Sequence, residues 1–253
     1  MLVRGNASEP ASLDPQLVQD SVGGAIVVDL FQGLPRSGPR GDTEPAMATS
    51  WASSNNNLTW TFQLREDGRW SDGSRVTAQD FVYGWRRAVD PEVGSNYAYY
   101  IEAAGVANDG EIIAGEKTPD TLGVRAVDDF TFEVTLDEPI TYLPDMTVHY
   151  TIFPAPRQAI EAHGNRWVRP EHIVVNGPYK PVFWQPRDKL IMVRNEAYWD
   201  HEQVAIPRAV IIFSDDEARK TIRQLGDHIE RKDGVGGREM GAQCFRLICK
   251  EYV

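Results

Sequence analysis

The stretch that decides the fold runs from Thr59 to Pro91, TWTFQLREDGRWSDGSRVTAQDFVYGWRRAVDP. It opens with six residues in which apolar and polar side chains alternate, the pattern of a half-buried strand. Asp-Gly turns follow at 67–68 and 72–73, and a short strand is predicted between them. The predicted order is therefore strand, turn, short strand, turn and helix. Three tryptophans are in phase with buried faces, and we expect them in the core: Trp60, Trp70 and Trp85.

The helix at the end of this stretch carries its own start and stop signals. Thr77 is placed as an N-cap residue, and Asp80 occupies the position of the capping-box acid three residues later. Pro91 closes the helix. The apolar residues between these signals share one helical face: Phe81, Val82, Trp85 and Ala88.

These residues resemble the signature of the solute-binding proteins that serve peptide-type ABC transporters, the family of the periplasmic oligopeptide-binding proteins. Other segments of the chain resemble the same family, in the same order, and together they cover about residues 2 to 222. These segments are LVRGNASEPASLDP (2–15), DLFQGL (29–34), the P-x-x-A-x-S-W segment (45–51), VVNGPYK (174–180) and the block 193–199, which ends in Tyr198-Trp199.

The resemblance implies a mixed α/β (α+β) fold of the type II periplasmic-binding-protein kind. In that family the chain leaves one lobe, builds a second and returns to the first. We therefore assign residues 1–34 and 157–225 to a discontinuous, incomplete lobe I and residues 35–156 to lobe II, with the return near Pro154. A full family member continues with a large C-terminal lobe, which is missing from this sequence.

Hydrophobic periodicity predicts the elements outside the opening stretch. One short helix is predicted to start near Ser21. The other predicted helices cover Glu102–Ile113, Pro139–Met146, Arg157–His163 and Asp215–Leu225. The predicted strands are Leu122–Ala126, Thr131–Leu136, Tyr179–Trp184, Lys189–Arg194 and Pro207–Phe213. Residues 35–44, which are rich in Gly and Pro, are expected to form a loop.

Charge and hydropathy exclude several classes of protein. The net charge of -11 argues against a surface for nucleic acid or for an anionic membrane, because both require clustered Lys and Arg. No apolar run reaches the length of a membrane span, so no membrane insertion is expected. The sequence shows no signal peptide, although family members are exported. Three explanations stay open: a leader outside this sequence, a misplaced start, or a product that stays in the cytoplasm.

The tail, residues 226–253, differs in character from the rest of the chain and is expected to be disordered or out of frame. It is rich in glycine and contains both cysteines, Cys244 and Cys249. Their C-x4-C spacing fits neither a zinc site nor a redox motif. Because the resemblance stops within a predicted helix, we expect a frame shift near Leu225 and a truncated product. The alternative is a diverged short paralogue.

The sequence predicts no catalytic residue, no metal site and no cofactor, and hence no enzyme. There is no G-x-S-x-G elbow, phosphate loop or dinucleotide fingerprint. Adjacent carboxylates such as Asp128-Asp129 are interpreted as turn formers. The histidines are dispersed, without the spacing of a metal pair: His149, His163, His172 and His201.

Three residues are predicted to bind substrate. Tyr97 lies in the loop after the helix, and the matching tyrosine of the family faces the cleft and contacts the peptide; packing with Tyr99 and Tyr100 is the alternative. Gln19 and Ser21 match the segment from which the first lobe contacts the peptide. The family's oligopeptide-binding member has an acid and a valine there, so this chain departs at both positions. Main-chain hydrogen bonds, which hold the peptide like an added strand, tolerate such changes.

The resemblance implies a periplasmic protein that captures oligopeptides and delivers them to an ABC-transporter permease. We expect it to act as a monomer. The alternatives are another cargo (murein peptide, dipeptide, haem or nickel) or a non-transport interaction module. Closure on a ligand needs two lobes that face each other. Since the large lobe is missing, we expect this chain to bind peptides weakly or not at all.

Overall fold

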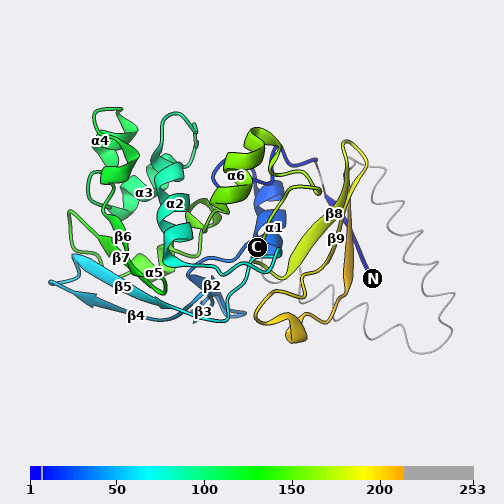
Figure 1. Ribbon diagram of the computed structural model, residues 1–253, viewed down its shortest axis with the longest axis horizontal. Helices are drawn as coiled ribbons and strands as arrows, with labels where there is room; N and C mark the ends of the chain where they lie inside the picture. Colours follow the sequence, from blue (N-terminus) through cyan, green and yellow to red (C-terminus); the bar gives the residue numbers. More distant parts are fainter. Residues whose placement is uncertain (7, 214–253) are drawn as a thin grey trace, which may run out of the picture.

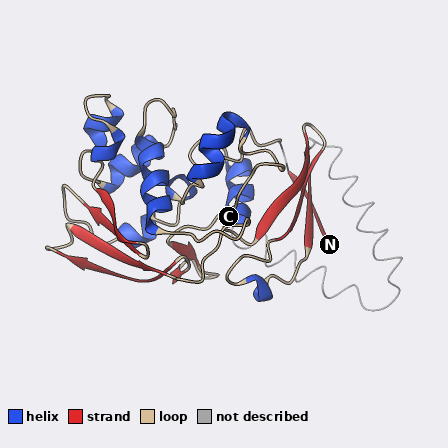
Figure 2. Ribbon diagram, in the orientation of Figure 1, coloured by secondary structure: helices blue, strands red, loops and turns tan. Residues whose placement is uncertain are grey.

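The computed structural model describes residues 1–6 and 8–213 of the chain (Figure 1). Two four-stranded sheets lie toward opposite ends of the molecule; some helices lie over one of the sheets and others lie between the two (Figure 2). The predicted helix Asp215–Leu225 and the tail 226–253 lie outside the described residues.

One sheet, here called the terminal sheet, combines strands from both ends of the described chain and lies at the right of Figure 1. Its strands are β1 (Leu2–Asn6), β8 (Tyr179–Gln185), β9 (Lys189–Arg194) and β10 (Arg208–Phe213), in the order β1-β10-β9-β8. β1 runs parallel to β10, with Leu2 opposite Ala209, and the other pairs are antiparallel. Helix α1 (Ser21–Leu30) lies against one face of this sheet (Figure 1).

The second sheet, here called the middle sheet, is antiparallel and comes from the centre of the sequence. It contains β4 (Ala48–Ser54), β5 (Thr59–Leu64), β6 (Val124–Asp128) and β7 (Thr131–Thr135), in the order β4-β5-β7-β6. Helix α2 (Ala78–Val89) packs on β6 and β7. Trp85 meets Phe132 edge to face with ring centroids 5.4 Å apart, and both side chains are fully buried. One hydrophobic cluster runs continuously through both sheets.

Shorter elements connect the two sheets. β2 (Pro35–Ser37) and β3 (Thr43–Pro45) form a two-stranded sheet. The remaining α-helices are α3 (Ala98–Ala104), α4 (Asp109–Ile113), α5 (Leu143–Met146) and α6 (Arg157–His163). Single 3-10 turns occur at η1 (Pro119–Thr121), η2 (Tyr150–Ile152), η3 (Gly164–Arg166) and η4 (His201–Gln203).

The opening stretch folds largely as predicted. β5 and the capping box of α2 are confirmed: the Thr77 N–H donates to the Asp80 carboxylate at 2.7 Å. The three tryptophans are buried, each at most 6% exposed. The short strand predicted around Trp70 is wrong, because the two turns leave room for a single bridge between Arg69 and Arg75. The hairpin of β8 and β9 and helix α6 also agree with the predicted ranges.

Three predicted elements need correction. The single helix expected over 102–113 is two helices, because Gly105 takes a left-handed φ of 65° and Val106 pairs with Leu136 in a bridge. The helix expected over 139–146 is limited to α5, because Pro144 has no N–H for the Ile140 carbonyl, which accepts the Trp60 indole N–H. The loop expected over 35–44 contains the β2–β3 pair.

The strands of the terminal sheet come from the ranges assigned to lobe I, and those of the middle sheet from the range assigned to lobe II. The boundaries of that division stay a prediction. The predicted return near Pro154 is a segment that crosses α2 at close range. The Ala155 N–H donates to the Asp80 carbonyl at 3.2 Å, and a Cβ at Gly84 would lie 2.3 Å from the Phe153 carbonyl oxygen.

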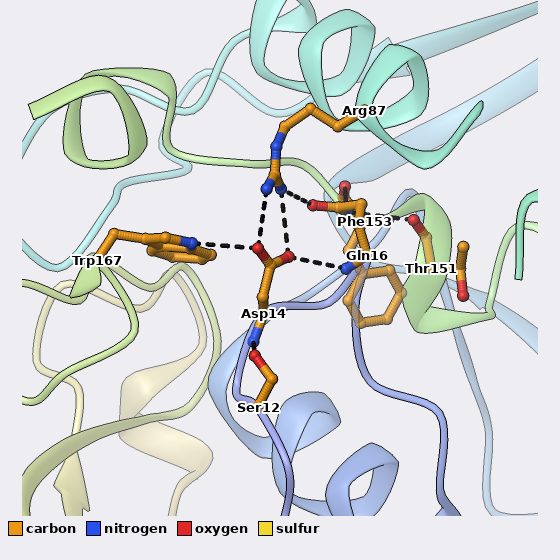
Figure 3. Close-up of polar contacts among 7 residues, drawn as sticks. All are labelled: Ser12, Asp14, Gln16, Arg87, Thr151, Phe153 and Trp167. Carbon is orange, nitrogen blue, oxygen red and sulfur yellow. Dashed lines mark hydrogen bonds and ion pairs between the residues drawn. The ribbon is translucent and has the colours of Figure 1, made fainter. Parts of the chain in front are cut away.

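A buried ion pair joins the N-terminal segment to α2 (Figure 3). Asp14 is 1% exposed, and its carboxylate accepts both terminal Arg87 nitrogens at 2.9 and 3.2 Å. It also accepts the Trp167 indole N–H at 3.1 Å and the Gln16 N–H at 3.0 Å. The Gln16 side chain accepts from Arg87 at 2.6 Å and donates to the carbonyl of Phe153. Four distant segments thus share one polar network.

We predict that Gly84→Ala lowers the free energy of unfolding by about 1–3 kcal/mol, because the added methyl group overlaps the Phe153 carbonyl. Denaturant unfolding measures the change. Gly110→Ala is the matched control: this glycine lies in α4 with no atom near the added Cβ, so the variant should match or exceed wild type. Equal stability of both variants would contradict the close contact.

Asp14→Asn should destabilise the protein by about 3–5 kcal/mol, because it leaves the Arg87 guanidinium buried without a counter-charge. Thermal and denaturant unfolding provide the measurement. The control is Glu161→Gln, which breaks the exposed pair with Arg157 and should change stability by at most about 0.5 kcal/mol. A loss as small as the control's would show that the buried pair does not stabilise the fold.

Candidate functional site

Five aromatic rings gather beside the N-terminal end of α1, and we call them the aromatic cluster: Tyr97, Tyr99, Tyr100, His149 and Tyr150. The His149 ring is stacked between Tyr100 and Tyr150, with centroids 4.4 and 4.3 Å away. The ring centroid of Tyr97 lies 5.3 Å from that of His149 and 5.7 Å from that of Tyr99. Tyr99 is 56% exposed, so the cluster presents aromatic surface to the solvent.

Local turns place these rings. Tyr97 is the N-cap residue of α3, and its amide donates to the Ser95 hydroxyl at 3.3 Å. The Tyr100 hydroxyl donates to the Met146 carbonyl at 3.0 Å, which ties α3 to the segment that carries His149. Tyr150 lies against α1 where a glycine is required: a Cβ at Gly24 would be 2.7 Å from the Tyr150 ring.

The structure brings the predicted site residues Tyr97 and Gln19 together. The Tyr97 hydroxyl donates to the Gln19 carbonyl at 3.3 Å. Ser21 follows as the first residue of α1, and the side chains of Gln19 and Ser21 are exposed. Between them, Asp20 caps the helix by accepting the Gly23 N–H at 2.6 Å. The substrate-binding role of the three predicted residues stays a prediction.

Burial favours the neutral form of the His149 imidazole. It lowers the pKa of His149 to about 4. The Thr151 N–H donates to Nδ1 of this ring at 3.3 Å, which leaves the proton of the neutral imidazole on Nε2. Burial, and after it the neighbouring Tyr97, raise the pKa of Tyr150 well above its usual range. The cluster therefore offers neutral O–H and N–H donors next to ring faces.

A separate, shallow cavity of about 410 Å³ lies near the start of β8. None of the predicted site residues lines it. Its walls come from two loops and the edge of the terminal sheet: Ser71, Asp72, Pro170, Glu171, His172, Ile173, Val174, Lys180, Pro181 and Val182.

The described part of the chain contains neither a cluster of metal ligands nor a helix that could cross a membrane. Residues 1–6 and 8–213 hold no group of three or more His, Cys, Asp or Glu side chains placed to bind a metal ion. His163 and His172 do stack, with centroids 3.9 Å apart, but no third such ligand joins them within these residues. Within the same ranges, none of the helices has the length and apolar character that a membrane crossing requires.

Sequence reasoning missed His149 and Tyr150 as members of this site. Both lie far from Tyr97 in the sequence, and no spacing motif links them to it. Their contact with Tyr97 arises only because the chain returns past α2 and α1. The one local signal is a His-Tyr pair just before Pro154, and this pair is too common to predict a site.

Comparison with known proteins places the chain in a sequence family. The model of "Bacterial extracellular solute-binding proteins, family 5 Middle" matches residues 42–227. The periplasmic oligopeptide-binding protein OppA of Salmonella typhimurium is 40% identical over 99% of this chain, and that of Escherichia coli is 43% identical over 99%. The E. coli murein peptide-binding protein MppA is 38% identical over 90%.

Solved structures agree with the sequence matches. OppA of Haemophilus influenzae, in complex with the peptide RPPGFSPFR, gives a TM-score of 0.85 at 36% identity over 89% of this chain and 44% of its own. Burkholderia pseudomallei OppA gives 0.84 at 38% identity, over 89% of this chain and 44% of its own. The mixed α/β fold implied by the family resemblance is thus confirmed.

The chain spans about 45% of the length of the OppA relatives from Salmonella and E. coli, and 42% of MppA. The two OppA alignments cover 99% of the chain and so continue past residue 225, whereas the family model ends at residue 227. The predicted loss of resemblance after Leu225 is therefore not seen in these two alignments.

We predict that His149 makes stability depend on pH. Its folded-state pKa of about 4 is below the usual value near 6.5, so the stability it contributes is present above about pH 6.5 and is lost as the pH falls toward 4. In His149→Phe, the loss of unfolding free energy between pH 7 and pH 4.5 should be smaller by about 1–2 kcal/mol, allowing for partial exposure of the ring.

Chemical denaturation at a series of pH values tests this expectation. His201→Phe is the control, because that ring lies in η4, outside the aromatic cluster. Identical pH profiles for His149→Phe and wild type would refute a buried neutral imidazole at this position.

Proposed function

The chain belongs to family 5 of the bacterial extracellular solute-binding proteins, and from this membership we propose that it captures oligopeptides in the periplasm and delivers them to the permease of an ABC transporter. The observation that carries the proposal is the match over 99% of the chain to proteins named for oligopeptide binding. The relatives are solute-binding proteins, and the proposal includes no catalytic step.

The aromatic cluster is the part of this chain that we propose contacts the peptide. It lies where the ranges assigned to the two lobes meet: Tyr97 comes from the lobe II range, and the Gln19 carbonyl that it binds comes from lobe I. An extended peptide presents carbonyl oxygens and aliphatic or aromatic side chains. The His149 Nε2–H and the hydroxyl of Tyr99, which is 56% exposed, supply donors for the former, and the rings of Tyr97 and Tyr99 supply apolar surface for the latter.

The peptide backbone would run beside Gln19, Asp20 and Ser21. The side chains of Gln19 and Ser21 are exposed, and the first N–H groups of a helix have no partner within the helix, so they can donate to a peptide carbonyl. Main-chain hydrogen bonds in this segment do not depend on side-chain identity. This supports binding of peptides even though Gln19 and Ser21 replace the acid and valine found in the oligopeptide-binding member of the family.

Because the chain spans about 45% of the OppA relatives' length, it supplies one wall of a cleft rather than a closed site. Closure around a ligand requires a second, facing surface. We therefore propose that this chain on its own holds peptides weakly, in the millimolar range, with fast exchange.

Murein peptide is the second candidate cargo. MppA of E. coli is similar to this chain both in sequence, at 38% identity, and in structure, with a TM-score of 0.84. The two cargoes differ in chemistry, since a murein peptide carries extra carboxylates. Comparing an uncharged tetrapeptide with a murein tripeptide separates the two possibilities.

We predict that saturation-transfer NMR detects binding of an uncharged tetrapeptide to the 253-residue chain, and that Tyr97→Ala reduces the transferred signal at least about fivefold. The loss follows from removing both a ring face and the hydroxyl that reaches the Gln19 carbonyl. Tyr142→Ala is the control, because this tyrosine is 51% exposed and lies outside the cluster.

Two results would overturn the expectation. Equal signals for Tyr97→Ala and Tyr142→Ala would separate peptide binding from the aromatic cluster. Calorimetry that gives a Kd of 1 μM or tighter for the isolated chain would show that peptide binding needs no second, facing surface. A stronger signal for the murein tripeptide than for the tetrapeptide would favour the second cargo.

A further inference from the structure

Asp109, the first residue of α4, holds its carboxylate in the protein interior with only part of its hydrogen-bonding capacity used. The residue is 7% exposed. Its Oδ1 accepts the Gly110 N–H at 2.5 Å, whereas its buried Oδ2 has no hydrogen-bond donor among the described residues. Burying a carboxylate oxygen without a donor costs free energy when the acid is ionised. The position therefore favours the neutral acid.

The charged groups that act on Asp109 favour the neutral acid as well. Glu102 on α3 and Asp137 after β7 are both acidic. Asp137 is tied to the end of α3, because its N–H donates to the Gly105 carbonyl at 2.9 Å. Burial raises the pKa of Asp109 to about 6, against the hydrogen bond from Gly110, and the two acids act in the same direction as burial.

The cations on the elements around α4 are engaged elsewhere. Lys117, which follows α4, pairs with Glu111 at 3.0 Å. On α2, Arg87 pairs with Asp14, and Arg86 donates to a backbone carbonyl at 2.7 Å. Helix α3 contains no Lys or Arg. Ionised Asp109 thus has two acids beside it and no ion-pair partner among the described residues.

The three acids belong to segments that depend on one another. Helices α3 and α4 have seven and five residues, a length at which a helix is not stable without tertiary contacts. They pack on each other at the end of the molecule away from the terminal sheet (Figure 1). Repulsion among Glu102, Asp109 and Asp137 therefore acts on the contacts that hold both helices.

Helix α3 also carries part of the aromatic cluster. Tyr97 is its N-cap residue, and Tyr99 and Tyr100 lie in its first turn. Loosening of α3 against α4 therefore reaches three of the five rings in the cluster.

We propose that Asp109 is a proton-operated switch for the α3–α4 unit: the neutral acid lets α4 close against α3, and the ionised carboxylate loosens both helices. Because the pKa in the folded protein is above the usual value of 3.8, the stabilisation is complete below about pH 3.8 and is lost as the pH rises through about 6. The unit is thus tighter in mildly acidic solution than at neutral pH. The consequence for peptide binding rests on the function proposed above.

Hydrogen exchange of the 253-residue chain without peptide tests the switch. Exchange is followed by mass spectrometry at about pH 5 and about pH 7.5, and the rates are corrected for the intrinsic pH dependence of exchange. In the wild type, protection of residues 98–114 should fall at least about threefold between the two pH values. In Asp109→Asn, which keeps the shape and lacks the charge, the corrected protection should be the same at both.

The variant comparison isolates Asp109 from other groups that titrate. His149 and the remaining acids are present in both proteins, so their effects cancel at each pH. Asp109→Ala also removes the charge and should show the same flat pH profile, although it loses the Gly110 hydrogen bond. Glu116→Gln is the matched control, because this acid is exposed and directly follows the α4 region; it should keep the wild-type pH dependence.

Three outcomes would overturn the proposal. The first is equal wild-type protection of residues 98–114 at both pH values. The second is a wild-type pH dependence that survives in Asp109→Asn and Asp109→Ala. The third is a dependence that Glu116→Gln abolishes as fully as Asp109→Asn, which would assign it to the acidic surface as a whole. Since no peptide is present, the switch and the proposed transport function can fail independently of each other.

Discussion

The buried ion pair of Asp14 and Arg87 is the interaction on which the arrangement of the two sheets depends. The N-terminal segment belongs with the terminal sheet, whereas α2 covers the middle sheet, and this pair joins them (Figure 3). Trp167 and Gln16 supply further hydrogen bonds to the same carboxylate. A charge this deep in the protein is tolerated only because every acceptor position is used. The network thereby links the segment before α1 to α2 and to the return segment.

The same junction positions the candidate site. The Gln16 side chain donates to the carbonyls of Thr151 and Phe153 in the return segment. His149 and Tyr150 directly precede these residues in the chain, and Tyr97 follows α2. The aromatic cluster therefore forms only when α1, α2 and the return segment are correctly packed. The neutral form of the His149 imidazole follows from this packing, since burial lowers its pKa to about 4.

Local signals predicted the elements whose stabilising contacts are also local. The capping box at Thr77, the alternation of β5 and the hairpin of β8 and β9 need only neighbouring residues. The break at Gly105 goes with the pairing of Val106 with Leu136, a contact that no short window of sequence contains. The family resemblance suggested Tyr97 as a site residue. The contacts of His149 and Tyr150 with Tyr97 are long-range, so they became visible only in the folded structure.

The parallel pairing of β1 with β10 has a consequence for how the chain folds. The first strand finds its partner only after about two hundred further residues have been made, which takes roughly 10–40 s at ordinary rates of translation. Until then residues 2–6 have no neighbouring strand, and the middle sheet has time to form from its own nearby segments. Contacts of such long range slow the final step and leave apolar strands open to aggregation. The terminal sheet is therefore the last part of the described protein to assemble and the part most in need of a chaperone.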